Sequence, residues 1–226
     1  MIQNLAQVLR LMLVTDDRLL AGRDLVEVCR AAERGGVTVV QLRLKAAAPR
    51  DLVELVRRLK TVLQVPVLVN DRLDVAMAGG ADGVHLGPDD VPVVLARKIA
   101  PPGFVIGASV GTPEEVENGR RADYWGVGPY QATGTKAGAG DALGPEGLRG
   151  IIRLAEGKVC VAIGGVQPED VGSILRCEAA GIAVVSGILG ASDTEGASRS
   201  YAVALSTDLG SAGTAPPPGG VPRSFG

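Results

Sequence analysis

A short aliphatic run near the start of the chain carries three polar side chains at alternate positions. In VVQLRLK (39–45), Gln41, Arg43 and Lys45 share one face of the expected strand. An exposed edge strand would also carry polar residues on one face, but the opposite face here is apolar, with Leu42 and Leu44, and helical segments bracket the run. Two cations and an amide on one face are suited to binding an anion.

Acidic residues follow the next two aliphatic runs. Asn70-Asp71 ends VPVLVND, and Asp89-Asp90 follows GVHLGP. Turns and helix N-caps favour both residue types, which is one explanation. The other is a divalent cation, because carboxylates beside a basic phosphate site repel the ligand unless a metal lies between them. Mg²⁺ takes one or two carboxylates together with phosphate oxygens and water, so we predict that Asp71 and Asp90 bind Mg²⁺.

Glycine-rich segments follow the last two aliphatic runs, as IGGV (163–166) and VVSGI (184–188). Glycines between a strand and a helix allow backbone N–H groups to bind a phosphate. A third segment, VGPYQATGTK (127–136), contributes Thr133, Thr135 and Lys136, and Ser109 ends another run. We therefore expect two anion sites, one basic with acids beside it and one lined by glycine.

Other reactive residues have simpler interpretations. His85 is the only histidine, so we expect packing or hydrogen bonding inside the fold rather than catalysis. The three cysteines (Cys29, Cys160 and Cys177) are far apart, and we interpret them as buried thiols in a reducing cytosol. Arg72 follows the first acid and could contact a ligand or form a salt bridge at a helix start.

Eight aliphatic runs must position these residues. They are LMLV (11–14), VTVVQL (37–42), VPVLV (65–69), GVHL (83–86), FVIG (104–107), DYWGVG (123–128), VCVAI (159–163) and IAVV (182–185). Most precede a segment with helical periodicity, such as 23–34 and 49–63. This pattern favours a single α/β domain over residues 1–205, a (β/α)₈ TIM barrel with its site at the carboxyl ends of the strands. A doubly wound open sheet is the alternative.

The C-terminal segment and the composition set further limits. Residues 206–226 are rich in Gly, Pro and Ser, which predicts a disordered tail. The net charge of −2 argues against nucleic acid or an anionic membrane as a partner and leaves small anionic molecules. No run approaches the roughly 18 apolar residues of a membrane span, and no signal peptide precedes the first strand. We expect a cytoplasmic protein.

Six motifs in order, QLRLK, VNDR, GVHLGPDD, GVGPYQATGTK, AIGGV and VVSGI, make the chain resemble the thiamine-phosphate synthase family over residues 11–205. The resemblance implies a TIM barrel that joins 4-amino-5-hydroxymethyl-2-methylpyrimidine diphosphate to hydroxyethylthiazole phosphate and releases pyrophosphate. It also implies Mg²⁺ as the cofactor and a homodimer as a possible state. These small molecules would then be the partners.

The resemblance also implies roles for individual residues. Gln41, Arg43 and Lys45 would contact the pyrimidine diphosphate, Asn70 and Lys136 its pyrophosphate, with Ser109 nearby, and Asp71 and Asp90 would bind Mg²⁺. Thr133 and Thr135 would line the thiazole site, and Gly165, Ser186, Gly187 and Ile188 its phosphate. Arg43, Lys45 and Lys136, together with Mg²⁺, would neutralise the departing pyrophosphate. The thiazole nitrogen would then capture the pyrimidine cation without a protein nucleophile.

The chain departs from the family pattern at Leu44, Pro88, Gly111 and residues 130–132, none of which is an expected phosphate or metal ligand. Two rival functions remain on the same barrel. A thiazole tautomerase would use a histidine near the end of the fifth strand, where GASVGTPEE contains none. A non-catalytic phosphate-binding regulator would not need the metal and diphosphate residues.

Overall fold

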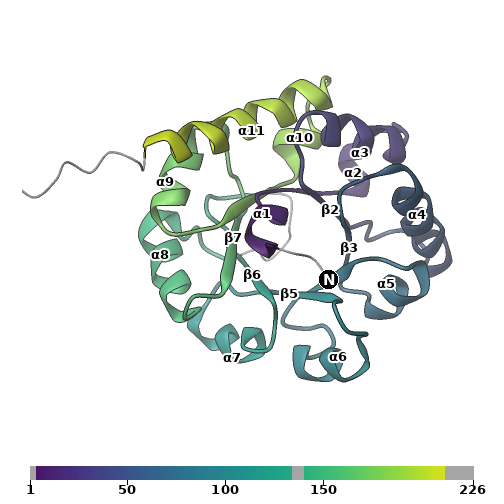
Figure 1. Ribbon diagram of the computed structural model, residues 1–226, viewed down its shortest axis with the longest axis horizontal. Coiled ribbons are helices and arrows are strands. Elements are labelled where there is room, and N and C mark those ends of the chain that lie inside the picture. Colours follow the sequence, from purple (N-terminus) through teal and green to yellow (C-terminus); the bar gives the residue numbers. More distant parts are fainter. Residues whose placement is uncertain (1–3, 134–139, 212–226) are drawn as a thin grey trace, which may run out of the picture.

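The computed structural model describes residues 4–133 and 140–211. Its eight parallel strands close into a barrel in which each strand pairs with its neighbours in sequence and β8 pairs with β1 (Figure 1). The strands are β1 (Leu11–Val14), β2 (Val39–Leu42), β3 (Val67–Asn70), β4 (Gly83–Leu86), β5 (Val105–Ser109), β6 (Tyr124–Val127), β7 (Val159–Ile163) and β8 (Gly181–Val184). The predicted (β/α)₈ barrel is therefore confirmed, and the open sheet is excluded.

Helices surround the barrel, and most of them connect successive strands, apart from α1, which precedes β1 and lies over the centre of the barrel (Figure 1). They are α1 (Leu5–Val8), α2 (Asp17–Leu20), α3 (Leu25–Arg34), α4 (Pro49–Val62), α5 (Leu73–Gly79), α6 (Val93–Ile99), η1 (Pro113–Glu115), α7 (Val116–Gly119), α8 (Gly144–Leu154), η2 (Pro168–Asp170), α9 (Val171–Arg176), α10 (Ser186–Leu189) and α11 (Thr194–Ser211). Local sequence explains several boundaries. The Asp24 side chain accepts from the Val26 amide at 2.7 Å and so caps α3, whereas Pro49 begins α4.

The core has two layers because successive side chains of a strand point to opposite faces. On β2, Val39 faces the barrel interior, whereas Val40 and Leu42 pack against the outer helices. Gln41 shares the inner face with Val39 and is 3% exposed. The predicted alternation of polar and apolar residues on this strand is therefore confirmed, and it directs the polar side chains toward the barrel axis.

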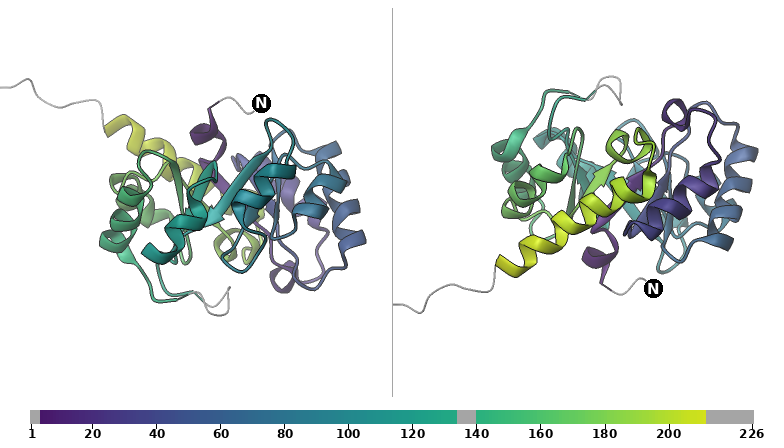
Figure 2. Two further views of the ribbon diagram at one scale, coloured as in Figure 1. Left: turned by 90° about the horizontal axis from the view of Figure 1, so that it is seen from below. Right: turned by 90° about the horizontal axis from the view of Figure 1, so that it is seen from above.

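The amino end of the barrel is closed by α1. Leu9, which follows this helix, is fully buried in the inner cluster, and Leu5 and Val8 pack against that cluster. In the side views, α1 lies at the end opposite the segments that leave β6 and enter α8 (Figure 2). This packing leaves the carboxyl ends of the strands as the open end of the barrel.

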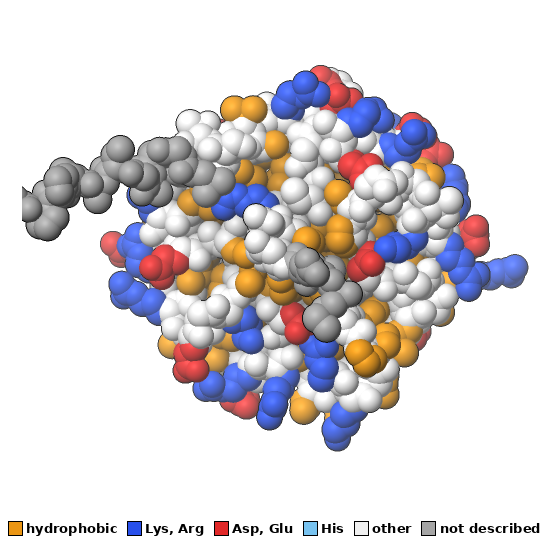
Figure 3. Space-filling model, viewed as in Figure 1, with side chains coloured by type: hydrophobic (Ala, Val, Ile, Leu, Met, Phe, Trp, Pro, Cys, Tyr) orange, Lys and Arg blue, Asp and Glu red, His pale blue; other side chains and the backbone are white. Residues whose placement is uncertain are grey.

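The C-terminal helix corrects the expected domain boundary. Helix α11 continues to Ser211, so ordered structure extends past Leu205, and residues 212–226 lie outside the described part of the chain. Across the face that surrounds α1, cationic and acidic side chains both occur around the rim, in line with the small net charge (Figure 3). Within residues 4–133 and 140–211, no helix combines the length and the hydropathy needed to cross a membrane.

Candidate active site

A cavity of about 1300 Å³ opens at the carboxyl ends of the strands. Most of the predicted site residues line it, namely Gln41, Arg43, Lys45, Asn70, Asp71, Asp90, Ser109, Thr133, Gly165, Ser186 and Gly187. Ile188 does not line it and is fully buried in the outer core. Thr135 and Lys136 lie outside the described residues. The barrel thus collects side chains that are far apart in the sequence into one space.

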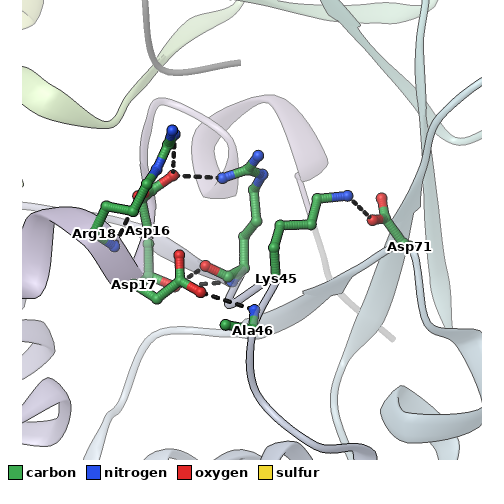
Figure 4. Close-up of polar contacts among 8 residues, drawn as sticks. Asp16, Asp17, Arg18, Lys45, Ala46 and Asp71 are labelled. Atoms are coloured by element: carbon green, nitrogen blue, oxygen red, sulfur yellow. Dashed lines mark hydrogen bonds and ion pairs between the residues drawn. The ribbon is translucent and has the colours of Figure 1, made fainter. Parts of the chain in front are cut away.

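The two cations that follow β2 are each paired with an acid from another strand end. Arg43 Nη1 lies 2.7 Å from Asp16 Oδ2, and Lys45 Nζ contacts the Asp71 carboxylate. The view of this cluster has Lys45 pointing toward Asp71, with Asp16 beside Arg18 (Figure 4). The Arg43 side chain is 14% exposed and that of Lys45 is 56% exposed, so both remain accessible to an anion in the cavity.

Asp71 and Asp90 lie close together at the ends of β3 and β4. Burial raises the pKa of Asp90 above its ordinary value, and the neighbouring Asp71 carboxylate raises it further, while the Gly87 amide opposes the shift. That amide donates to Asp90 Oδ2 at 2.6 Å. Two acids that repel each other and have Lys45 beside them form an oxygen-rich site for a cation. Among the described residues, no cluster of three or more potential metal ligands occurs.

Below the charged side chains, the barrel interior contains a hydrogen-bonded network. The ring of His85 lies between the Tyr124 hydroxyl, 2.9 Å from Nδ1, and the Ser109 hydroxyl, 3.1 Å from Nε2. Burial raises the pKa of Tyr124 well above its ordinary value, so this hydroxyl stays protonated and neutral. The expected hydrogen bonding of His85 inside the fold is confirmed, and one consequence is that Ser109 is held in position at the cavity floor.

The opposite side of the cavity is made of backbone. Gly164 and Gly165 have φ angles of +96° and +68°, which side chains rarely tolerate. A Cβ atom on Gly165 would lie 2.8 Å from Gln131 Cβ. The amides of Tyr130 and Gln131 donate to the carbonyls of Ile163 and Gly164 at 2.8 and 2.9 Å. Within the described residues, the Gly165 amide has no protein acceptor, so it is available to a ligand.

Tyr201 of α11 supports this backbone from below. Its hydroxyl donates to the Val166 carbonyl at 3.0 Å, and a Cβ atom on Gly187 would lie 2.1 Å from the same hydroxyl oxygen. The Ile188 amide donates to the Val185 carbonyl at 3.2 Å and is therefore not available to a ligand.

The loop that contains Gly164 and Gly165, together with Ser186 and Gly187, is hereafter the glycine half. Arg43, Lys45, Asn70, Asp71 and Asp90, together with Asp16 and Asp17 after β1, are the charged half.

Sequence reasoning missed two features of the charged half. Asp16 and Asp17 follow β1 and line the cavity, as Asp71 and Asp90 do after β3 and β4. The acid pair in LVTDD was a signal of the same kind as the two that were recognised. For Arg72, the salt-bridge interpretation is correct, because its Nε lies 2.8 Å from Asp74 Oδ1.

Comparisons with known proteins identify the family of this chain. The family model described as thiamine monophosphate synthase matches residues 11–188. A thiamine-phosphate synthase of Xanthobacter autotrophicus is 47% identical over 202 residues, which cover 87% of this chain and 95% of that protein. One of Syntrophomonas wolfei is 47% identical over 197 residues, covering 84% and 92% of the two chains.

Among solved structures, thiamine phosphate pyrophosphorylase from Pyrococcus furiosus superimposes with a TM-score of 0.79 at 36% identity, covering 91% of this chain and all of that one. The curated relatives and this structure match the chain across the whole barrel and over nearly their own full length. The chain belongs to the thiamine monophosphate synthase family, whose members are transferases.

Proposed function

We propose that the protein joins 4-amino-5-hydroxymethyl-2-methylpyrimidine diphosphate to hydroxyethylthiazole phosphate and releases pyrophosphate. The observation that carries this proposal is that cationic side chains with acids beside them and a glycine-rich backbone segment line the same cavity. The charged half offers two cations and a pair of acids, which suits a diphosphate and its metal. The glycine half offers backbone amides, which suit a monophosphate. We propose that the cavity of about 1300 Å³ lined by both halves holds the two heterocycles.

The diphosphate is assigned to the charged half because its charge matches the side chains there. The guanidinium of Arg43 has five N–H donors, and among the described contacts only Nη1 is engaged by a side chain. Lys45 adds a more exposed cation, and Asn70 lies at the end of β3 beside Asp71. Lys136 is proposed to complete this set, although it lies outside the described residues.

The acid pair fits a magnesium ion by the chemistry of its donors. Mg²⁺ prefers oxygen ligands and usually keeps several waters, so two carboxylates are enough when phosphate oxygens complete the shell. The raised pKa of Asp90 reflects burial and its neighbour Asp71, and a cation between the two would relieve that repulsion. A magnesium ion held by Asp71 and Asp90 would neutralise charge on the pyrophosphate.

The residues of the chain then act by electrostatics and orientation. The bond between the pyrimidine methylene carbon and the diphosphate oxygen breaks, and the electron pair leaves with pyrophosphate. Arg43 and Lys45 stabilise that growing negative charge, because they are fixed before the reaction begins. Gln41 and Ser109, at the cavity floor, orient the pyrimidine, and the thiazole nitrogen forms the new C–N bond. No protein nucleophile takes part.

A thiazole tautomerase is disfavoured at the position where it would need a histidine. A Cβ atom on Gly111 would lie 2.6 Å from the Gly128 carbonyl oxygen, so the backbone here has no room for a side chain. The Gly111 amide also donates to Glu115 Oε2 at 2.6 Å, which fixes this turn. A phosphate-binding regulator is disfavoured because it would not need the charged half.

One assay separates these functions. The purified protein is incubated with both substrates and Mg²⁺, and pyrophosphate and thiamine phosphate are measured together. A synthase forms both products in equal amounts and only when both substrates are present. Isomerisation of a thiazole phosphate without pyrophosphate would indicate the tautomerase. Binding of thiazole phosphate without any turnover would indicate the regulator, and either result would overturn the proposal.

A further inference from the structure

Asp16 is a buried acid that the proposed chemistry does not use. It directly follows Thr15 at the end of β1, and only 1% of its surface is exposed. Its Oδ1 accepts from the Arg18 amide at 3.0 Å and from Arg18 Nε at 3.2 Å. Its Oδ2 accepts from Arg43 Nη1 at 2.7 Å. A buried carboxylate is costly unless it is paired, so these contacts explain why an acid is tolerated here.

Arg43 is held by the end of β1 at both its backbone and its side chain. The Arg43 amide donates to Thr15 Oγ1 at 2.8 Å, and the Thr15 hydroxyl donates to the Arg43 carbonyl at 3.1 Å. Asp16 holds one edge of the guanidinium. The other nitrogens, Nε and Nη2, have no protein acceptor among the described residues. The contact of Nη1 with Asp16 therefore orients the guanidinium, and Nε and Nη2 remain available to a ligand.

The charge state of Asp16 agrees with this arrangement. Burial alone would raise the pKa of Asp16, but hydrogen bonds from Arg18 and Arg43 outweigh it and hold the pKa below its ordinary value. Asp16 is therefore ionised at neutral pH and maintains its ion pair with Arg43. A long arginine side chain without such a partner would lose its single orientation, and displacement by about 1 Å can lower a rate by about 10²-fold.

We propose that Asp16 is a positioning residue that orients Arg43 toward the leaving pyrophosphate, an inference that rests on the proposed function. Asp16 does not itself contact the diphosphate, since both of its oxygens are occupied by arginines. Its effect on the reaction passes through Arg43. Removal of the Asp16 carboxylate should therefore lower kcat only when Arg43 is present.

A double-mutant cycle tests this dependence, with the wild type, Asp16→Asn, Arg43→Ala and the double variant. We expect Asp16→Asn to lower kcat by about 10- to 100-fold and to change the KM for thiazole phosphate little. In the Arg43→Ala background the same change should have no further effect on kcat. If the two losses multiply instead, Asp16 acts independently of Arg43 and the inference is overturned.

Asp17→Asn is the matched control. Asp17 Oδ2 accepts from the Ala46 amide at 2.8 Å, so it holds the same loop through the backbone (Figure 4). Among the described side-chain contacts, Arg43 pairs with Asp16 and not with Asp17. Its effect on kcat should be the same with or without Arg43. If Asp16→Asn does not fold, the cycle is run with Asp16→Glu, which keeps the charge and displaces it by one methylene. A wild-type kcat for Asp16→Glu would then overturn the inference.

A binding measurement separates this inference from the proposed function. The affinity of inorganic pyrophosphate with Mg²⁺ is measured by calorimetry on the same four proteins. Asp16→Asn should weaken binding in the wild-type background and have no effect in the Arg43→Ala background. If the wild type binds pyrophosphate in this pattern but does not turn over the two substrates, the proposed function fails and the positioning role stands. Equal weakening in both backgrounds would overturn the positioning role.

Discussion

The charged half and the glycine half of the cavity bind anions by different physical means. In the charged half, side chains from the ends of β1 to β4 meet in ion pairs, such as Arg43 with Asp16 and Lys45 with Asp71. In the glycine half, the ligand would meet backbone, whose path depends on positive φ angles at Gly164 and Gly165. Anion binding in the charged half would depend on the charges of side chains. Anion binding in the glycine half would depend on close approach of the ligand to backbone amides.

This difference suits the two steps of the proposed reaction. The leaving pyrophosphate gains charge as its bond breaks, so charged groups that are already in place lower the barrier. The thiazole phosphate keeps its charge throughout, so the glycine half needs only to bind and orient it. Changes in the charged half should therefore affect kcat, and changes in the glycine half should affect KM.

The largest effect is expected on removal of the metal. EDTA should abolish most turnover of the wild type, and Asp71→Asn or Asp90→Asn should do so while the fold is retained. A bound cation supplies several kcal/mol of stabilisation, which corresponds to more than about 10³-fold in rate. Steady-state assays with and without added Mg²⁺ measure this effect, and circular dichroism checks the fold. Full activity in EDTA would contradict the assignment of a metal to these two acids.

Arg43→Ala should follow, with a loss in kcat of about 10²–10³-fold and a smaller rise in KM for the diphosphate. Lys136→Ala is expected to behave similarly. Kinetics with each substrate varied in turn measure both parameters. Arg58→Ala is the control, because this exposed arginine lies on α4 and only approaches Asp24 at 3.9 Å. If Arg43→Ala impaired thiazole phosphate binding and spared the diphosphate, the two halves would be assigned the wrong way round.

Gly165→Val should raise the KM for thiazole phosphate more than it lowers kcat, in contrast to Arg43→Ala. It places a side chain where Cβ meets Gln131 at 2.8 Å, so the backbone must move and the KM for thiazole phosphate should rise by about tenfold or more. Gly157→Val is the matched control, since Gly157 also has positive φ, +86°, but no atom within 4 Å of its Cβ position. A change confined to the diphosphate KM would contradict the assignment of the glycine half.

Acid should weaken the charged half through Asp16. Its pKa is lower in the folded protein than in the unfolded chain, where it is about 3.9. The stability that its charge contributes is therefore complete above that pH and is lost as the pH falls through the folded pKa. The difference in Tm between the wild type and Asp16→Asn should be largest near pH 7 and should shrink below about pH 4. A constant difference across this range, in thermal unfolding monitored by circular dichroism, would contradict the ion pair.

The smallest effect is expected for the C-terminus, which belongs to neither half. Deletion of residues 212–226 should leave Tm and turnover nearly unchanged, because their composition offers few apolar anchors. Deletion from Ser206 should cost slightly more stability, because it also removes the last part of α11. Thermal unfolding and steady-state assays of both truncations measure this. A large loss of turnover in the shorter deletion would show that this segment contributes to the site.

The positions of the strands could be predicted from the sequence more closely than the exact residues at which strands and helices end. The runs GVHL and VCVAI coincide with β4 and β7. In contrast, β3 continues to Asn70, which the hydrophobic run does not include, because Asn70 still pairs with His85 in the ladder. Composition also misplaced the end of α11. The helix continues through Ser206 to Ser211, and the Ser206 hydroxyl donates to the Ala202 carbonyl one turn earlier at 2.9 Å.

The sequence by itself determined the order of eight strands, the polar inner face of β2 and the glycines after β7 and β8, because these follow from side-chain alternation and local backbone preference. Only the tertiary structure decided which charges meet. Arg43 pairs with Asp16 across 27 positions and Lys45 with Asp71 across 26. Those pairings depend on the register between neighbouring strands and on barrel closure, which are set by packing of the whole domain.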